Sequence, residues 1–205
     1  MHFEPNQIYH VYNRGNNKTR IFFNEDNYLY LLKKVRNEWL KYCDVVCYCL
    51  MPNHFHFMLQ AKSSGCEPVI LNKTESSIQN LSKAIGKSLS SYTLAINEQN
   101  KTTGNLFQKK TRAKCLSDLS VNADGFAVTD YLLTCFHYIH LNPLRANLVN
   151  NLGDWSYSSW PVYVGLHQDD LCSVEKWMKI LGLSSSDLVA LNDFALNETI
   201  LERLW

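Results

Sequence analysis

The pattern of apolar and polar positions changes its period along the chain, and these changes predict a mixed α/β protein. Short runs of β-branched and aromatic residues predict strands, whereas apolar residues at spacings of three and four predict amphipathic helices. A tight connection over 51–53 predicts an antiparallel pair of strands. In chain order we expect a strand over 8–12, a helix over 25–42, and strands over 45–50 and 54–60. An irregular loop over 61–73 and a helix that begins at Thr74 or Ser76 and runs to about 97 should follow. A strand within 106–116 and a helix from 130 that stops before Asn142-Pro143 complete the order.

The order strand, helix, strand, strand, helix, strand predicts a ferredoxin-like antiparallel sheet with helices on one face. The other face would then stay open for a ligand. Two weaker helical patterns, over 173–182 and 186–204, come after this run. We therefore expect an α/β domain over residues 1–164 and an acidic helical C-terminal extension over 165–205.

Charge is distributed unevenly between these two parts. Residues 165–205 hold seven acidic and three basic side chains, which leaves 17 basic and 12 acidic side chains in residues 1–164. Five bases and no acid lie between Lys101 and Lys114. This basic stretch is compatible with a solvated loop, and it also suits a polyanionic partner.

Composition narrows the class of protein. No run approaches the ~18 apolar residues that a membrane-spanning helix needs, and residues 1–6 do not have the pattern of a secretory signal. The seven cysteines are scattered, without a Cys-x-x-Cys pair. We therefore expect a cytoplasmic protein, without membrane partner, disulfide scaffold or zinc ribbon.

The tripeptide His54-Phe55-His56 is the main candidate for chemistry. Residues two apart on a strand point to the same face, so the two imidazoles would stand side by side. Phe55 and Phe57 would anchor the strand from the opposite face. Such a pair can hold a metal ion if a third ligand arrives from elsewhere; otherwise the histidines are half-buried polar residues.

Several separately placed motifs follow one another over residues 5–165. They are Tyr9-His10-Val11-Tyr12-Asn13-Arg14-Gly15, Met51-Pro52-Asn53-His54-Phe55-His56, Tyr92 with Asn97, Gly104 and Leu106-Phe107-Gln108, and Tyr138-Ile139-His140-Leu141-Asn142-Pro143-Leu144-Arg145-Ala146. With them the chain resembles the IS200-like single-tyrosine transposases of the HUH superfamily, which include the REP-associated tyrosine transposases. In that superfamily the histidine pair binds a divalent metal and a tyrosine attacks single-stranded DNA. The resemblance implies metal-dependent cleavage and strand transfer through a 5′-phosphotyrosine intermediate, on hairpin DNA.

By this resemblance we expect Tyr92 to be the nucleophile, five residues before Asn97 and twelve before Gly104. Tyr92 also lies on the apolar stripe of its helix, so a buried core tyrosine is the competing interpretation. The next candidates are Tyr9, Tyr12 and Tyr131, each better suited to the core or the rim of a site.

The resemblance also implies a metal ligand about one turn after the tyrosine, with an amide or acidic side chain. Four residues after Tyr92 is Ile96, which cannot ligate, so the expected third ligand is Asn97. A helix C-cap is an equally good interpretation of Asn97. Mg²⁺ or Mn²⁺ is the metal that the resemblance implies, while two histidines also suit zinc.

DNA contacts are expected from basic side chains in or near these motifs. They are Arg14, Lys109, Lys110, Arg112, Lys114 and Arg145. Tyr12 or Phe107 can stack an unpaired base, whereas His10 and His140 are expected to be structural residues close to the site. The resemblance allows a homodimer with the tyrosine supplied in trans, and also a monomer.

Two other functions compete with strand transfer. A domesticated relative would recognise hairpin DNA without cutting it. A zinc hydrolase would use the histidine pair with a metal-bound water. The sequence disfavours the hydrolase, because it places no further cluster of His, Asp or Glu near His54 and His56.

Overall fold

The sheet has four antiparallel strands in the order β2-β3-β1-β6, as a ferredoxin-like fold requires. The computed structural model describes residues 1–71, 74–117 and 127–189. The four strands are β1 (Ile8–Arg14), β2 (Cys43–Met51), β3 (His54–Ala61) and β6 (Arg112–Cys115).

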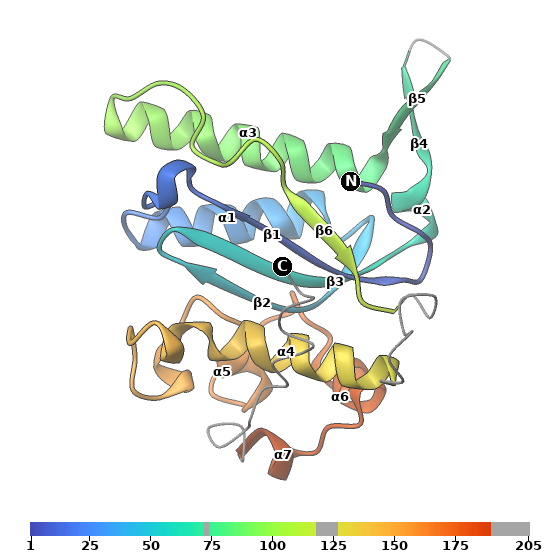
Figure 1. Cartoon of the computed structure of the whole chain (residues 1–205), viewed down its shortest axis with the longest axis vertical. Helices are drawn as coiled ribbons and strands as arrows, with labels where there is room; N and C mark the ends of the chain where they lie inside the picture. Colours follow the sequence, from blue (N-terminus) through green and yellow to red (C-terminus); the bar gives the residue numbers. More distant parts are fainter. Residues whose placement is uncertain (72–73, 118–126, 190–205) are drawn as a thin grey trace.

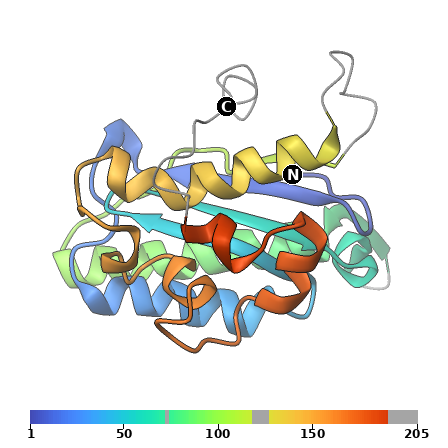
Figure 2. The same cartoon turned by 90° about the horizontal axis from the view of Figure 1, so that it is seen from below.

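Helices cover both faces of this sheet, in three layers (Figure 1). On one face lie α1 (Glu25–Glu38) and α3 (Asn80–Asn100), which pack against each other. On the other face α4 (Val128–Arg145) runs lengthwise over β2 and β3. Short elements continue this second layer: η3 (Leu152–Asp154), α5 (Trp160–Tyr163), α6 (Val174–Leu181) and α7 (Ser185–Val189) (Figure 2). The expectation of helices on one face alone is therefore wrong.

The second layer is needed because the second face of the sheet is also apolar. Cys49 is the register partner of His56, and Met58 lies two residues further along β3, so both share the histidine face. Both side chains are fully buried. Two wholly buried faces are usual for the central strands of a sheet between two helical layers.

A β-hairpin replaces the irregular loop that we expected over 61–73. After α2 (Ser63–Cys66), β4 (Pro68–Leu71) pairs with β5 (Thr74–Gln79), and the hairpin projects from the end of the molecule (Figure 1). Helix α3 accordingly begins at Asn80, later than the expected start at Thr74 or Ser76. A short 3-10 turn, η1 (Asn16–Lys18), follows β1.

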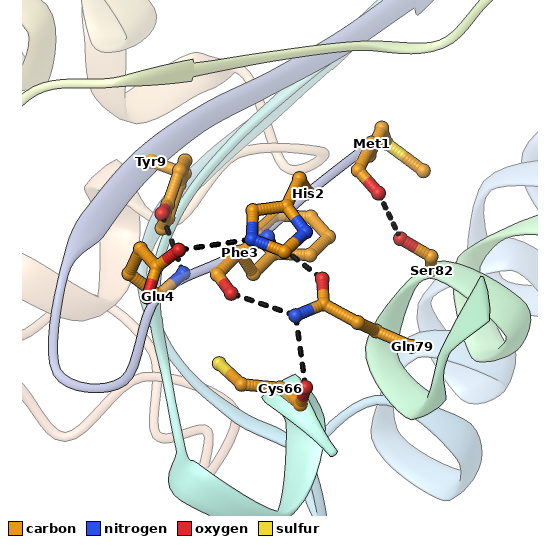
Figure 3. Close-up of polar contacts among 8 residues, drawn as sticks. All are labelled: Met1, His2, Phe3, Glu4, Tyr9, Cys66, Gln79 and Ser82. Carbon is orange, nitrogen blue, oxygen red and sulfur yellow. Dashed lines mark hydrogen bonds and ion pairs between the residues drawn. The ribbon is translucent and has the colours of Figure 1, made fainter. Parts of the chain in front are cut away.

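Gln79 ties the start of α3 to the N-terminal segment (Figure 3). Its side-chain Oε1 accepts from the backbone N–H of Phe3 (2.7 Å), and its Nε2 donates to the carbonyl oxygens of Phe3 and Cys66 (2.8 Å each). One amide group thus satisfies three backbone groups.

Helix α4 continues through Pro143 to Arg145, beyond its expected end. Proline lacks an N–H, so the carbonyl of Ile139 loses its normal helical donor. The side chain of Asn142 compensates: its Nδ2 donates to the carbonyl oxygens of Tyr138 (2.8 Å) and Ile139 (3.5 Å). The same bonds orient the amide, because its nitrogen faces the helix backbone and its oxygen points away.

The segment after α4 fastens that helix to β2. Ser159 Oγ lies 2.8 Å from His140 Nε2 on α4 and accepts from the backbone N–H of Tyr48 on β2 (2.9 Å). Trp155 Nε1 donates to the carbonyl of Leu50, also on β2 (3.1 Å).

The C-terminal extension joins the same hydrophobic core, through Leu171, Trp177 and Leu188. Helix α6 confirms the helix expected over 173–182. Helix α7 covers the start of the pattern over 186–204, and the rest of that pattern lies outside the described residues. Among the helices that the structure describes, none combines the length and apolar character needed to cross a bilayer.

Replacing Ser159 by alanine should lower the free energy of unfolding by about 2 kcal/mol, because the Tyr48 N–H and the His140 ring lose a buried partner. Urea denaturation followed by tryptophan fluorescence measures the change. Ser156→Ala, at an exposed position of the same segment, is the control and should leave the midpoint unchanged. Equal midpoints for both variants would show that Ser159 does not fasten α4 to β2.

Candidate active site

The histidine pair lies on β3, on the face that α4 covers. Antiparallel pairing sets Tyr12 opposite His56 and Arg14 opposite His54, so all four side chains share one face of the sheet. The rings of His54 and His56 have centroids 5.0 Å apart. His56 is fully buried and His54 is half-buried. The expected side-by-side placement of the two imidazoles is confirmed.

Hydrogen bonds engage the same nitrogen of each ring. His54 Nδ1 lies 2.6 Å from the side-chain oxygen of Asn53, and His56 Nδ1 lies 2.8 Å from His10 Nε2. An amide oxygen only accepts, so His54 carries its proton on Nδ1 and a lone pair on Nε2. The Nε2 lone pair of His54 can therefore serve as a metal ligand.

Electrostatics keep both imidazoles neutral. Burial and, to a smaller extent, the positive charge of Arg14 lower the pKa of His54 to about 4. Burial also holds the pKa of His56 well below its usual range, with His10, His54 and Arg14 acting in the same direction. Neutral imidazole is the form that binds metals, so the site is ready for an ion at neutral pH.

Helix α4 brings a tyrosine and an amide to the pair. Tyr138 presents its ring edge-on to His56, with centroids 5.5 Å apart, and Asn142 is one helical turn further along the same face. The side chain of Asn142 lies close enough to His54 to affect its pKa, and its Oδ1 accepts from the hydroxyl of Tyr138 (3.4 Å). Asn142 is therefore a neighbour of both His54 and Tyr138.

The environment of Tyr138 holds its phenol protonated. Burial raises its pKa, and only part of that rise is opposed by the hydrogen bond with Asn142 and the charge of Arg145. The side chain is 8% exposed. A reaction at this hydroxyl must therefore remove its proton when the substrate is in place.

The donors of His54, His56 and Asn142 suit a divalent ion. Two neutral imidazoles and one amide oxygen form a mixed nitrogen–oxygen set that Mn²⁺, Mg²⁺ or zinc can accept. Over the described parts of the chain, no three residues of the types His, Cys, Asp and Glu lie close enough to share an ion. A third donor beside the two histidines would therefore have to be of another type, such as the amide of Asn142.

A basic cavity of about 260 Å³ opens beside the histidines. Its lining residues are Tyr12, Asn13, Arg14, His54, His56, Gln108, Lys110 and Arg112. Within the described residues, Arg14 Nε is buried and has no hydrogen-bond partner. Three cations around one cavity can neutralise a phosphate backbone.

Tyr92 does not reach this site. It is fully buried on α3, on the other face of the sheet, where its hydroxyl donates to the carbonyl of Ile21 (2.7 Å). Its ring packs against Phe107, which in turn packs against Phe55 on the opposite side of β3 from the histidines. A side chain so enclosed cannot serve a second copy of the chain either. The expectation that Tyr92 faces the histidine pair is wrong, and the core interpretation holds.

Asn97 lies near the C-terminal end of α3, on the same side of the sheet as Tyr92. Its Nδ2 donates to the carbonyl of Gly104 (2.9 Å) and its Oδ1 accepts from the hydroxyl of Thr102 (3.1 Å). Its backbone carbonyl accepts from Lys101 and Thr102. Asn97 therefore closes the helix C-terminus, and as a predicted metal ligand it is wrong.

The predicted DNA contacts fall into two groups. Arg14, Lys110 and Arg112 line the cavity beside the histidines. The others are dispersed: Lys109 lines a neighbouring cavity, Lys114 is the register partner of His10 on β6, and Arg145 is exposed at the end of α4. Tyr12 lines the main cavity, whereas Phe107 is buried.

Tyr138 and Asn142 are the residues that sequence reasoning missed. The signal was present, because the two lie four residues apart in one motif, the spacing expected of a tyrosine and a ligand one turn later. Asn97, five residues after Tyr92, did not meet that spacing.

A scan against protein-family models finds no match to this chain, and a search of curated proteins finds no relative. Among solved structures, the chain is similar to a REP-associated tyrosine transposase bound to a REP hairpin. The two share 15% sequence identity with a TM-score of 0.54, over 82% of this chain and 86% of the other. At this identity the likeness establishes a shared fold.

The neutral buried histidines should make stability depend on pH. Their folded-state pKa values, about 4 for His54 and about 3 for His140, lie below the ordinary 6.5, so the unfolded chain binds more protons in acid. Stability is therefore complete above pH 6.5 and should fall as the pH drops from 6.5 towards 4. Urea titrations between pH 7.5 and 4.5, with a chelator present, measure the free energy of unfolding.

His140→Gln should reduce the steepness of that fall by up to about 1.4 kcal/mol per pH unit, since one buried histidine no longer titrates. Comparison with the parent protein removes the contribution of the carboxyl groups, which both proteins share. Parallel curves would contradict the burial of a neutral His140.

Proposed function

We propose that this protein cleaves and rejoins single-stranded DNA through a 5′-phosphotyrosine intermediate, with Tyr138 as the nucleophile. One observation carries the proposal: Tyr138 and Asn142, one turn apart on α4, lie against His54 and His56. The likeness to a hairpin-bound transposase supports a DNA hairpin as the partner.

The reaction exchanges one phosphodiester for another. The hydroxyl oxygen of Tyr138 would attack phosphorus, the bond to the 3′ oxygen would break, and the released 3′ oxygen would take up a proton while the phenol loses one. Because the phosphotyrosine bond retains the energy of the original bond, the strand can be rejoined without ATP.

The side chains around Tyr138 suit this step. Asn142 Oδ1 lies within 3.4 Å of the phenol and orients it, while Arg14 and Arg112 would neutralise the negative charge of the phosphate. A divalent ion held by His54, His56 and Asn142 would polarise the phosphoryl oxygen and stabilise the charge that develops there. The basic cavity would hold the unpaired strand, with Tyr12 as a stacking surface.

A labelled single-stranded hairpin oligonucleotide tests the assignment. With Mn²⁺ or Mg²⁺ the protein should form an adduct that survives a denaturing gel. Tyr138→Phe should lower its yield by at least about 100-fold because the attacking oxygen is gone, and a chelator should abolish it. Tyr92→Phe is the matched control: it removes a buried tyrosine hydroxyl from the other face of the sheet and should keep the adduct.

The possible outcomes separate the competing functions. An adduct that persists in Tyr138→Phe and disappears in Tyr92→Phe would overturn the assignment of the nucleophile. Hairpin binding without an adduct under either metal would indicate a protein that recognises hairpins without cutting them.

We also propose that one chain supplies the whole site, because Tyr138 faces the histidines of its own chain. A mixture of Tyr138→Phe and His56→Ala should then form no more adduct than either variant alone. Recovery of adduct towards about a quarter of the parent level would show that the tyrosine works in trans between two copies.

A further inference from the structure

The most deeply buried polar contact of the site joins histidines from two neighbouring strands. His10 Nε2 on β1 lies 2.8 Å from His56 Nδ1 on β3. The two rings are stacked, with centroids 5.1 Å apart and an interplanar angle of 22°. His10 is fully buried and His56 is 1% exposed.

His10 is enclosed and does not line the basic cavity. Tyr12, which does, stacks on it at 4.6 Å and 29°, and Tyr138 meets it edge-on at 6.4 Å. DNA in the cavity would therefore touch Tyr12, not His10. An effect of His10 on the reaction would therefore be indirect, and His56 is the neighbour to which it is hydrogen-bonded.

The proton between the two rings can lie on either side, and the choice decides whether His56 can bind metal. If His10 donates, His56 accepts on Nδ1, carries its proton on Nε2 and has no lone pair for an ion. If His56 donates from Nδ1, its Nε2 lone pair is available. His54 already has the second arrangement, because its partner, Asn53 Oδ1, can only accept.

We propose that His10 is a positioning residue that accepts the Nδ1–H of His56 and so presents the Nε2 lone pair of His56 to a divalent ion; this rests on the metal site of the proposed function. The stacked ring of Tyr12 and the pairing of β1 with β3 hold His10 in place for this task. Asn53 and His10 would then have the same role: each accepts the Nδ1–H of one histidine and leaves the Nε2 lone pair of that histidine for the ion.

Two variants of similar size test the proposal. His10→Phe keeps a stacked ring but cannot accept a hydrogen bond, whereas His10→Gln offers a carbonyl oxygen. Nitrogen-15 NMR of the metal-free protein at pH 7.5 reports the tautomer of His56, and calorimetric titration with Mn²⁺ alone reports its affinity.

In the parent protein His56 should be protonated on Nδ1. His10→Phe should shift it towards the Nε2-protonated form and weaken Mn²⁺ binding by 10–100-fold, roughly the cost of losing such a partner. His10→Gln should restore most of the affinity. Tyr92→Phe controls for a general loss of stability and should bind Mn²⁺ as the parent does.

Failure of this inference differs from failure of the proposed function. An Nε2-protonated His56 in the parent, or unchanged Mn²⁺ affinity in His10→Phe, would overturn the role of His10 while leaving a Tyr138-dependent adduct intact. A parent protein that neither binds Mn²⁺ nor forms the adduct would overturn the metal site and, with it, this inference.

Discussion

The antiparallel register between β1 and β3 is the constraint on which the candidate site depends. It sets Tyr12 opposite His56 and Arg14 opposite His54, and it brings His10 within hydrogen-bond distance of His56. Because side chains alternate with a period of two, a slip of one residue would send the histidines to the face that α1 and α3 cover. The phenylalanines of β3 prevent such a slip, since Phe55 and Phe57 fill the core on that face.

Burial of His54, His56 and Asn142 is tolerated because each of these side chains has a defined partner. Asn53 holds His54, His10 holds His56, and the amide nitrogen of Asn142 is bound to its own helix backbone. In a low-dielectric setting such bonds are strong and geometrically specific. Burial also disfavours the charged forms of these side chains, because it lowers the pKa of His54 and raises that of Tyr138. A site of this kind keeps its imidazoles neutral at pH 7.

Helix α4 brings Tyr138 and Asn142 to the histidines of β3, and the irregular C-terminal end of this helix helps to orient Asn142. Pro143 removes one backbone donor, and the side chain of Asn142 replaces it. That replacement leaves the amide oxygen facing outward, where it accepts from the hydroxyl of Tyr138. Ser159 and His140 then fasten the helix to β2. A local departure from ideal helix geometry thus orients the amide oxygen of Asn142 towards Tyr138, which regular spacing alone would not do.

The sequence alone determined what depends on near neighbours: the strand alternation that puts His54 beside His56, the apolar stripes of the helices, and the order of strands and helices along the chain that is typical of a ferredoxin-like fold. It missed the β4–β5 hairpin, because contacts with side chains distant in sequence decide that element. It ended α4 too early, because the side chain of Asn142 replaces the N–H that Pro143 lacks. Tertiary structure alone chose between Tyr92 and Tyr138. Both lie on the buried side of a helix, and only the packing of α3 and α4 on opposite faces of the sheet decides which tyrosine meets the histidines.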